Sequence, residues 1–381
     1  MKLNDISEFV TDKISSSSIS LDSYVTTDSL LQNKRGREGA LNLPPVPCTL
    51  THYRQGDVLV ANIRPYLKKV WYADSEGGCS SDVLVFRAKN GHCTSFLYTV
   101  LMQDSFFEYA MLGSKGSKMP RGDKDQIMRY ELPTFTPMEE ENIGNMMVDI
   151  MAKINVNRQI NDNLEAMARQ LYDYWFVQFD FPNEEGKPYK SSGGAMVWNE
   201  KLKHEIPQKW SDCVLGDYIG RITNGLNPRK NFVLGNGNNY YVTIRSLVGT
   251  TIDWNNCDRC DDEALSKINS RSQLQIGDII FSAIGTIGRT YYILEEPTNW
   301  NISETSFTLR AKENVPNDFF YGMLRSNEIQ IKADKAAMGS TLRCLVMDSL
   351  CSLQYIEIPS YMMKLFAAKG GCNLNCVKAC S

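Results

Sequence analysis

The sequence predicts an α+β protein with two tandem, similar, mixed α/β domains that are separated by a long coiled-coil-like helix. Three observations support this fold class. Motifs from the first half of the 381-residue chain return in the same order in the second half, as in a duplicated domain. The segment between the halves carries apolar residues at heptad spacing, which is typical of a coiled coil. Hydrophobic residues make up 43% of the chain, enough for packed cores.

The repeat consists of short motifs whose spacing changes only slowly, from 217 to 226 residues. Two copies of one domain with small loop insertions produce such a drift. The paired motifs include Tyr24-Val25-Thr26 with Tyr241-Val242-Thr243, Gly56-Asp57-Val58 with Gly277-Asp278-Ile279, Phe96-Leu97-Tyr98 with Phe319-Phe320-Tyr321, Gly116-Ser117 with Gly339-Ser340, and Leu132-Pro133 with Ile358-Pro359.

Each copy is predicted to mix strands and helices. A Gly-Asp turn precedes a buried strand in both, and residues 96–109 and 318–331 are apolar at helical spacing. Each copy then closes with a short strand that ends at a proline. The predicted segments are a first domain at 1–135, a long helix at 136–180, a connector at 181–211, a second domain at 212–359 and a tail at 360–381.

The long helix is expected to begin at Pro137, because three glutamates follow it where the helix dipole favours negative charge. Gly144 is its only glycine up to Phe176. We expect its stripe to be exposed and to dock a partner, although an ordinary amphipathic helix packed on its own domain remains an alternative. The stripe consists of Ile143, Met147, Ile150, Ile154, Asn157, Asn161, Leu164, Ala168, Leu171 and Trp175.

Charge and composition exclude several classes of protein. Lys and Arg number 41 and Asp and Glu 44, which excludes a histone-like polycation but not a local basic face. No run of about 18 apolar residues is present, so we expect no membrane span. The N-terminus lacks an apolar signal core, so we expect a cytoplasmic protein with reduced thiols.

The sequence gives no strong indication of a metal site. The lone CxxC at Cys257 and Cys260 lacks a second ligand pair, which favours a loop over a zinc site. The phosphate-loop and dinucleotide-binding motifs are also absent, so the sequence indicates no nucleotide cofactor.

Cations in polar or glycine-containing stretches are the candidate nucleic-acid contacts, since lysine and arginine there can reach phosphates or guanine edges. Solvated surface charge is the alternative for each of them. The candidates are Lys34, Arg35, Arg37, Lys115, Lys118 and Arg121 in the first copy, and Arg229, Lys230, Arg245, Arg289 and Arg343 in the second.

Several segments resemble the specificity (S) subunit of type I restriction-modification systems. They are the repeated Gly56-Asp57-Val58 and Gly277-Asp278-Ile279, the helical stretch 159–165, the aromatic stretch 171–182 and the entry Ile206-Pro207-Gln208-Lys209-Trp210. The resemblance covers about residues 1–360. It implies two target recognition domains that each read one half of a bipartite DNA sequence. It also implies a spacer helix that docks two methyltransferase subunits, which methylate adenine N6, and further restriction subunits. The S subunit itself would be non-catalytic and bind no cofactor.

The C-terminal end differs from that family, in which a second spacer helix follows the second domain. Only 22 residues follow Pro359, so we expect this helix to be missing. We then expect a shortened S subunit that pairs with another copy or another subunit, or else a product of gene rearrangement or a frameshift. The latter would be an inactive or phase-variant form that acts as a dimer or scaffold through its exposed helix. The tail cysteines Cys372, Cys376 and Cys380 could also bind a ligand. Two other classes remain open: a coiled-coil scaffold with two protein-binding domains, and an enzyme that uses Cys79 or Cys93.

Overall fold

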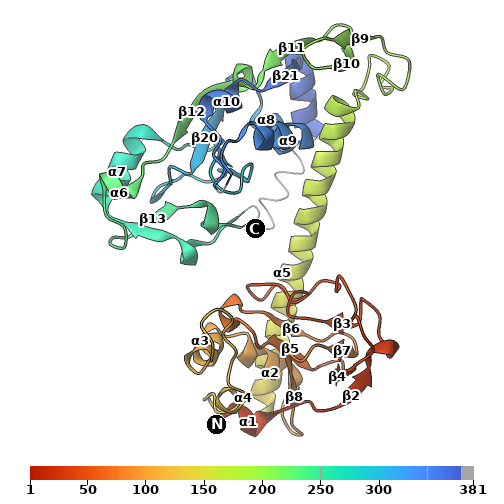
Figure 1. Ribbon diagram of the computed structural model, residues 1–381, viewed down its shortest axis with the longest axis vertical. Helices are drawn as coiled ribbons and strands as arrows, with labels where there is room; N and C mark the ends of the chain where they lie inside the picture. Colours follow the sequence, from red (N-terminus) through yellow and green to blue (C-terminus); the bar gives the residue numbers. More distant parts are fainter. Residues whose placement is uncertain (249–250, 341, 370–381) are drawn as a thin grey trace. The chain divides into compact units, whose positions relative to one another are not determined.

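The computed structural model describes residues 1–248, 251–340 and 342–369 (Figure 1). The tail cysteines Cys372, Cys376 and Cys380 lie outside the described residues. The chain divides into two compact units, Met1–Val156 and Asn157–Ser381. We call these unit 1 and unit 2 and describe each by itself.

Unit 1 contains two four-stranded sheets and a set of helices. The first sheet has the order β1-β8-β5-β6 and the second has the order β2-β4-β7-β3. The strands are β1 (Ser7–Phe9), β2 (Lys13–Ser15), β3 (Tyr24–Val25), β4 (Thr49–Tyr53), β5 (Val58–Ala61), β6 (Val70–Tyr72), β7 (Gly77–Cys79) and β8 (Val83–Ala88). The short helix α1 (Leu3–Ile6), α2 (Thr94–Leu101), α3 (Asp104–Leu112) and α4 (Lys124–Ile127) complete the unit. Helix α2 contacts β5, β6 and β8, and this helix–sheet contact forms the main core of the unit.

Unit 2 repeats the first of these sheets. Its four-stranded sheet has the order β12-β20-β17-β18 and a three-stranded sheet has the order β16-β13-β19. These strands are β12 (Ile219–Asn224), β13 (Asn239–Val242), β16 (Asp258–Cys260), β17 (Ile279–Ser282), β18 (Thr290–Tyr292), β19 (Trp300–Ile302) and β20 (Ser306–Ala311). The two-stranded pairs are β9 (Met196–Asn199) with β10 (His204–Pro207), β11 (Ser211–Val214) with β21 (Gln354–Glu357), and β14 (Leu247–Val248) with β15 (Thr251–Ile252). The helices are α6 (Pro228–Asn231), α7 (Asp262–Arg271), α8 (Asn317–Arg325), α9 (Asn327–Ala336), α10 (Met347–Cys351) and a segment at 360–369.

The two units share details that go beyond strand order. Gly56 and Gly277 both have positive φ, +89° and +91°, in the turn that enters β5 or β17. The next residue is a buried aspartate in both, paired with an arginine of the neighbouring strand. Tyr72 stacks on Tyr98 in unit 1 with ring centroids 5.2 Å apart, and Tyr292 stacks on Tyr321 in unit 2 at the same distance. The predicted duplication and the α+β fold class are therefore confirmed.

The helical stretch predicted in each copy is broken once. Gln103 separates α2 from α3 with an extended backbone (φ −68°, ψ 143°), and Ser326 separates α8 from α9 in the same way (φ −61°, ψ 146°). The Ser326 hydroxyl accepts a hydrogen bond from the Ile329 amide, so it caps α9 as serine commonly does. Apolar periodicity persists across such a break and does not reveal it.

The predicted long helix is confirmed as α5 (Pro137–Tyr172), 36 residues long, followed by a π-helical turn η3 (Asp173–Val177). Thr136 and Glu139 exchange hydrogen bonds at its start, in a capping box that satisfies free amides. Gly144 is buried where a β-carbon would lie 2.3 Å from the Ser95 hydroxyl oxygen. Only glycine therefore lets α5 approach the start of α2. None of the described helices is long and apolar enough to cross a membrane.

Candidate nucleic-acid interface

Two cation-bearing loops of unit 1 lie side by side. The loop between β5 and β6 (62–69) pairs with the loop at 33–34, because the Asn33 amide donates to the Leu67 carbonyl at 2.9 Å and the Lys34 amide to the Lys68 carbonyl at 2.8 Å. The ammonium groups of Lys34 and Lys68 both bind one carboxylate oxygen of Asp104, at 2.7 and 2.8 Å. These hydrogen bonds from the two lysines lower the pKa of Asp104. The triplet keeps one net positive charge.

The predicted glycine-containing loop at 113–125 packs against the same β5–β6 loop. The Lys115 and Arg121 backbones exchange hydrogen bonds of 2.9 and 3.0 Å, and the Arg64 amide donates to the Pro120 carbonyl. Lys115 forms an ion pair with Asp123 at 3.3 Å and Arg121 one with Asp82 at 3.0 Å. Both cations are mostly exposed, and Lys118 at the loop tip is exposed too. The structure therefore gathers predicted candidates from distant parts of the sequence on one edge of unit 1.

Arg35 and Arg37 differ in their surroundings. Arg35 is exposed. The Arg37 guanidinium lies over the Trp71 ring, 4.4 Å from its centroid, and donates to the Asp22 carbonyl at 2.6 Å. This cation–π contact gives Arg37 a structural role in unit 1.

Unit 2 has a hollow of about 550 Å³ that we call the arginine hollow. Arg245 and Arg289, both predicted from the sequence, line it together with Arg169 of α5 and Arg325 of α8. The Arg325 guanidinium binds the Glu165 carboxylate and the Tyr321 hydroxyl, each at 2.6 Å. With four arginines and one acidic side chain in its lining, the hollow is suited to a polyanion.

The other predicted cations of unit 2 lie outside the lining of the arginine hollow. Arg229 and Lys230 are exposed on the short helix α6, which Asn227 caps through its side-chain oxygen. Arg343 binds both carboxylate oxygens of Asp334 at 2.8 Å. The Arg343 charge is therefore largely neutralised by its own unit.

Sequence reasoning missed Arg64 and Lys68 of the β5–β6 loop, and Arg169 and Arg325 around the arginine hollow. The stretch Arg64-Pro65-Tyr66-Leu67-Lys68 carries cations but no glycine, so it lacks the feature that marks the predicted loops. Arg169 lies on the long helix, where the heptad pattern involves the apolar residues and gives no signal for a cation. Only the folded chain brings these side chains to the predicted ones.

The polar cluster around His92 has a structural role. His92 Nδ1 and the Glu140 carboxylate are joined by a 3.0 Å hydrogen bond, and Glu140 also accepts one from the Cys93 amide. This contact links the start of α5 to the start of α2. Within the described part of the chain, no group of three or more His, Cys, Asp or Glu side chains is placed to hold a metal ion. Cys257 is hydrogen-bonded to the Asp253 carbonyl, and Cys260 is buried.

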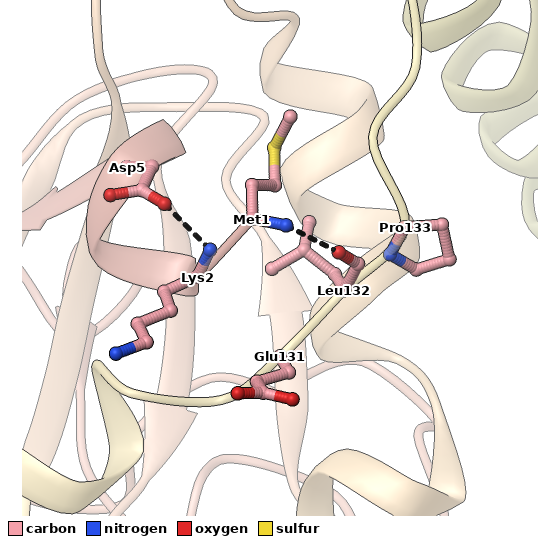
Figure 2. Close-up of a pocket in the computed structure, with 6 residues that line it drawn as sticks. All are labelled: Met1, Lys2, Asp5, Glu131, Leu132 and Pro133. Atoms are coloured by element: carbon pink, nitrogen blue, oxygen red, sulfur yellow. Dashed lines mark hydrogen bonds between the residues drawn. The ribbon is translucent and has the colours of Figure 1, made fainter.

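A shallow hollow at the N-terminus, of about 770 Å³, is shown in Figure 2. Two of its polar groups have partners within the fold, because the Met1 ammonium donates to the Leu132 carbonyl at 2.9 Å and the Lys2 amide to Asp5 at 2.7 Å. The hollow marks where the N-terminal segment pairs with the strand-like segment before Pro133. We assign it a structural role.

The predicted docking stripe of α5 varies along its length. Ile150 is exposed, whereas Ile143, Met147, Ile154, Leu164 and Leu171 are half-buried, as are Asn157 and Asn161. Trp175 is only 3% exposed and packs edge-on against Phe366 in the core of unit 2. Trp175 therefore anchors the end of the helix and is not part of a docking surface. Large apolar side chains that lie beside the stripe are exposed: Met146, Val156, Ile160 and Met167.

Known proteins with similar sequences are specificity subunits of type I restriction enzymes. The MjaIX specificity subunit of Methanocaldococcus jannaschii is 25% identical over 216 residues, or 56% of this chain and 47% of the relative. The HindI specificity subunit of Haemophilus influenzae is 25% identical over 164 residues, or 41% of this chain and 36% of the relative. The chain thus spans about half the length, or less, of the curated relatives it matches. These relatives confirm the resemblance that the sequence motifs indicate.

Solved structures that resemble this chain include a type I restriction-modification S subunit from M. genitalium, with 13% identity and a TM-score of 0.47, covering 100% of this chain and 92% of that one. Another is the HsdS subunit from Thermoanaerobacter tengcongensis, with 14% identity and a TM-score of 0.35, covering 100% of this chain and 90% of that one. No protein-family model matches the chain.

Proposed function

We propose that this chain is the non-catalytic DNA-recognition subunit of a type I restriction-modification complex. Each unit reads one half of a bipartite DNA target. The subunit positions two adenine-N6 methyltransferase subunits, and restriction subunits join that assembly. The complex acts on DNA in the cytoplasm of a prokaryotic cell.

One observation carries this proposal: in each unit, a basic loop follows the equivalent central strand of the repeated four-stranded sheet. The loop after β5 is bridged to Arg121 through Ile63, and the loop after β17 is bridged to Cys344 through Ile284. The loop after β5 carries Arg64, Lys68 and Lys69, and the loop after β17 carries Arg289, which aligns with Lys69. A basic loop at the equivalent place in each unit matches a target with two half-sites, because phosphate contacts fix the position of each unit on the duplex.

The proposal divides the chain by role. Residues 1–135 and 212–359 are the two target recognition domains, and the helix at 136–180 sets the distance between the half-sites. Residues 181–211 connect this helix to the second domain. In unit 1, Arg121, Lys118 and Lys115 contact DNA, together with Arg35. In unit 2, Arg245 and Arg289 do so within the arginine hollow.

The exposed apolar side chains of α5 are proposed to dock the methyltransferase subunits. Met146, Ile160 and Met167 are each more than 40% exposed. Exposed apolar surface of this extent on one helix is typical of a protein interface. Pairing of two copies of the chain through the same side chains is the alternative occupant.

Methylome sequencing tests the proposal directly. Cells that carry the chain with its neighbouring methyltransferase gene are compared with cells from which only this chain is deleted. We expect a bipartite motif with N6-methyladenine in each half to disappear on deletion and to return on complementation. If every methylated motif survives the deletion, the chain does not direct methylation and the proposal is wrong. Self-association of the purified chain without DNA binding would then favour the scaffold.

A further inference from the structure

Unit 1 holds three of its cations in a backbone conformation that is unfavourable for them. Arg64 and Lys68 of the β5–β6 loop have φ of +52° and +51°, and Lys34 of the paired loop has φ of +60°. A side chain with a β-carbon clashes with its own backbone in this left-handed region. Pro65 adds a second restriction, since a residue before proline favours extended conformations. Left-handed non-glycine residues are often found at functional sites.

The equivalent loop of unit 2, between β17 and β18, shows which residues occupy the positions of Arg64 and Lys68 in the second copy. The Ala61 amide donates to the Lys69 carbonyl, and the Ser282 amide donates to the Arg289 carbonyl in the equivalent place. Ile63 and Ile284 form equivalent bridges to Arg121 and Cys344. These pairs align Arg64 with Gly285 and Lys68 with Gly288.

Both of these glycines have positive φ, +82° for Gly285 and +86° for Gly288. The loop fold therefore requires the left-handed conformation at both positions, and glycine provides it without a clash. Unit 1 places an arginine and a lysine at these positions instead.

No contact of the Arg64 side chain within unit 1 compensates for the strain of its left-handed backbone. Among the described residues the Arg64 side chain has no hydrogen bond or ion pair, and its buried Nε has no partner. Lys68 and Lys34 share one oxygen of Asp104, so this group also keeps a positive charge. A buried guanidinium nitrogen without a partner is costly, and the part of the chain that the structure describes supplies no acceptor for the rest of the Arg64 guanidinium that would offset this cost.

We propose that Arg64, supported by Lys68 and Lys34, binds a phosphate of the DNA backbone, and that the left-handed conformation is retained because it presents the guanidinium to that phosphate. The inference rests on the proposed function and adds to it the residues by which unit 1 holds the duplex. A guanidinium presents five donors in a planar fork that matches a phosphate. The phosphodiester is thus the ligand class that its chemistry fits.

The test separates the role of the side chain from that of the backbone. In the full-length chain, Arg64→Gly removes the cation and relieves the left-handed strain, whereas Arg64→Lys keeps the charge. Lys203→Gly is the matched control. Lys203 is a left-handed lysine (φ +60°) in the β9–β10 hairpin, and its ammonium group pairs with Glu200. Each variant is measured for its melting temperature and for affinity to two duplexes across a salt series. One duplex carries the bipartite motif that methylome sequencing identifies, and the other has an unrelated sequence of equal length.

We expect Arg64→Gly to retain or raise the melting temperature while its affinity falls about tenfold on both duplexes, with the salt slope smaller by about one. Arg64→Lys should recover most of the affinity, and Lys203→Gly should bind DNA like the unchanged chain. Unchanged affinity and slope in Arg64→Gly would overturn the inference while leaving the proposed function intact. A large fall in its melting temperature would also overturn it, because the side chain would then be structural. An unchanged chain that binds neither duplex would overturn the proposed function, and the inference with it.

Discussion

The Arg310 guanidinium donates two hydrogen bonds to the Asp278 carboxylate, at 2.7 and 2.9 Å. Asp278 is fully buried and also accepts from the Gln275 amide at 2.9 Å. Unit 1 contains the same arrangement, in which Arg87 donates to Asp57 at 2.8 and 2.7 Å and the Arg54 amide donates to Asp57. The pair ties the turn that enters the central strand to the strand beside it. Each unit is therefore held by the same buried ion pair.

Removal of either aspartate should destabilise only its own unit. Because the arginine would be left without its buried partner, we expect Asp278→Ala to lower the stability of unit 2 by about 3 kcal/mol. Asp57→Ala should act likewise on unit 1. Calorimetry on the full chain would separate the two melting transitions. Glu263→Gln is the control, since its ion pair with Lys267 is exposed and should contribute less than about 1 kcal/mol. Equal shifts of both transitions by one variant would contradict independent units.

Gly144 should not tolerate a side chain, although alanine favours helices. An added β-carbon would lie 2.3 Å from the Ser95 hydroxyl and 2.5 Å from the Phe96 amide. We expect Gly144→Ala to destabilise unit 1 by about 1–3 kcal/mol through this clash. Without the clash the same change would stabilise the helix by about 1 kcal/mol. The sign of the shift in a denaturant midpoint therefore decides the matter, and Glu141→Ala on the exposed face of the same turn is the control.

The Asp104 carboxylate should make the stability of unit 1 depend on acid pH. Hydrogen bonds from Lys34 and Lys68 lower the pKa of Asp104 in the folded state. A lowered folded pKa means that the stabilisation is present above about pH 4, the unfolded value, and is lost as pH falls through the folded pKa. The free energy of unfolding of the Asp104→Asn variant should therefore depend less on pH below about pH 4 than that of the unchanged chain. Asp125→Asn, an exposed charge change in the same unit, should unfold like the unchanged chain.

Asp104→Asn should also change DNA binding, by raising the affinity for DNA. Asp104→Asn releases two ammonium groups from a shared carboxylate, so the basic edge of unit 1 gains about one positive charge. We expect higher affinity for unrelated DNA and a steeper dependence on salt. Filter binding over a salt series measures both quantities. A fall in affinity would show that Asp104 positions the lysines and does not merely neutralise them.

The arginine hollow should contribute to DNA binding through two side chains that the sequence already indicated. Replacement of both Arg245 and Arg289 by alanine should reduce the salt slope by about two, one for each lost phosphate contact. Lys187→Ala in the connector, an exposed charge outside the hollow, is the control of equal kind. If the double variant and the control bind alike, Arg245 and Arg289 are solvated surface charges. Circular dichroism should confirm that the double variant remains folded.

The sequence by itself determined the duplication, the strand that follows each Gly-Asp turn and the long helix from Pro137. These features are local: turn residues, apolar periodicity and caps act within a few positions and leave a readable pattern. It also indicated about half of the cations that the structure gathers, because glycine-containing loops mark accessible backbone. Trp175 shows where the pattern misled. Its place on the heptad seam suggested docking, yet the turn η3 directs it into the core against Phe366.

Only the tertiary structure decided which cations meet. Lys34 and Lys68 share Asp104, and Arg169 joins Arg289, across separations of 34, 70 and 120 residues that no local pattern encodes. The left-handed conformation of Arg64 likewise could not be predicted from the sequence, because glycine indicates a possible positive φ and arginine does not. Strand pairing fixes these positions: once β5 lies between β8 and β6, the loop that follows it must close at Arg64 and Lys68, whatever residues stand there.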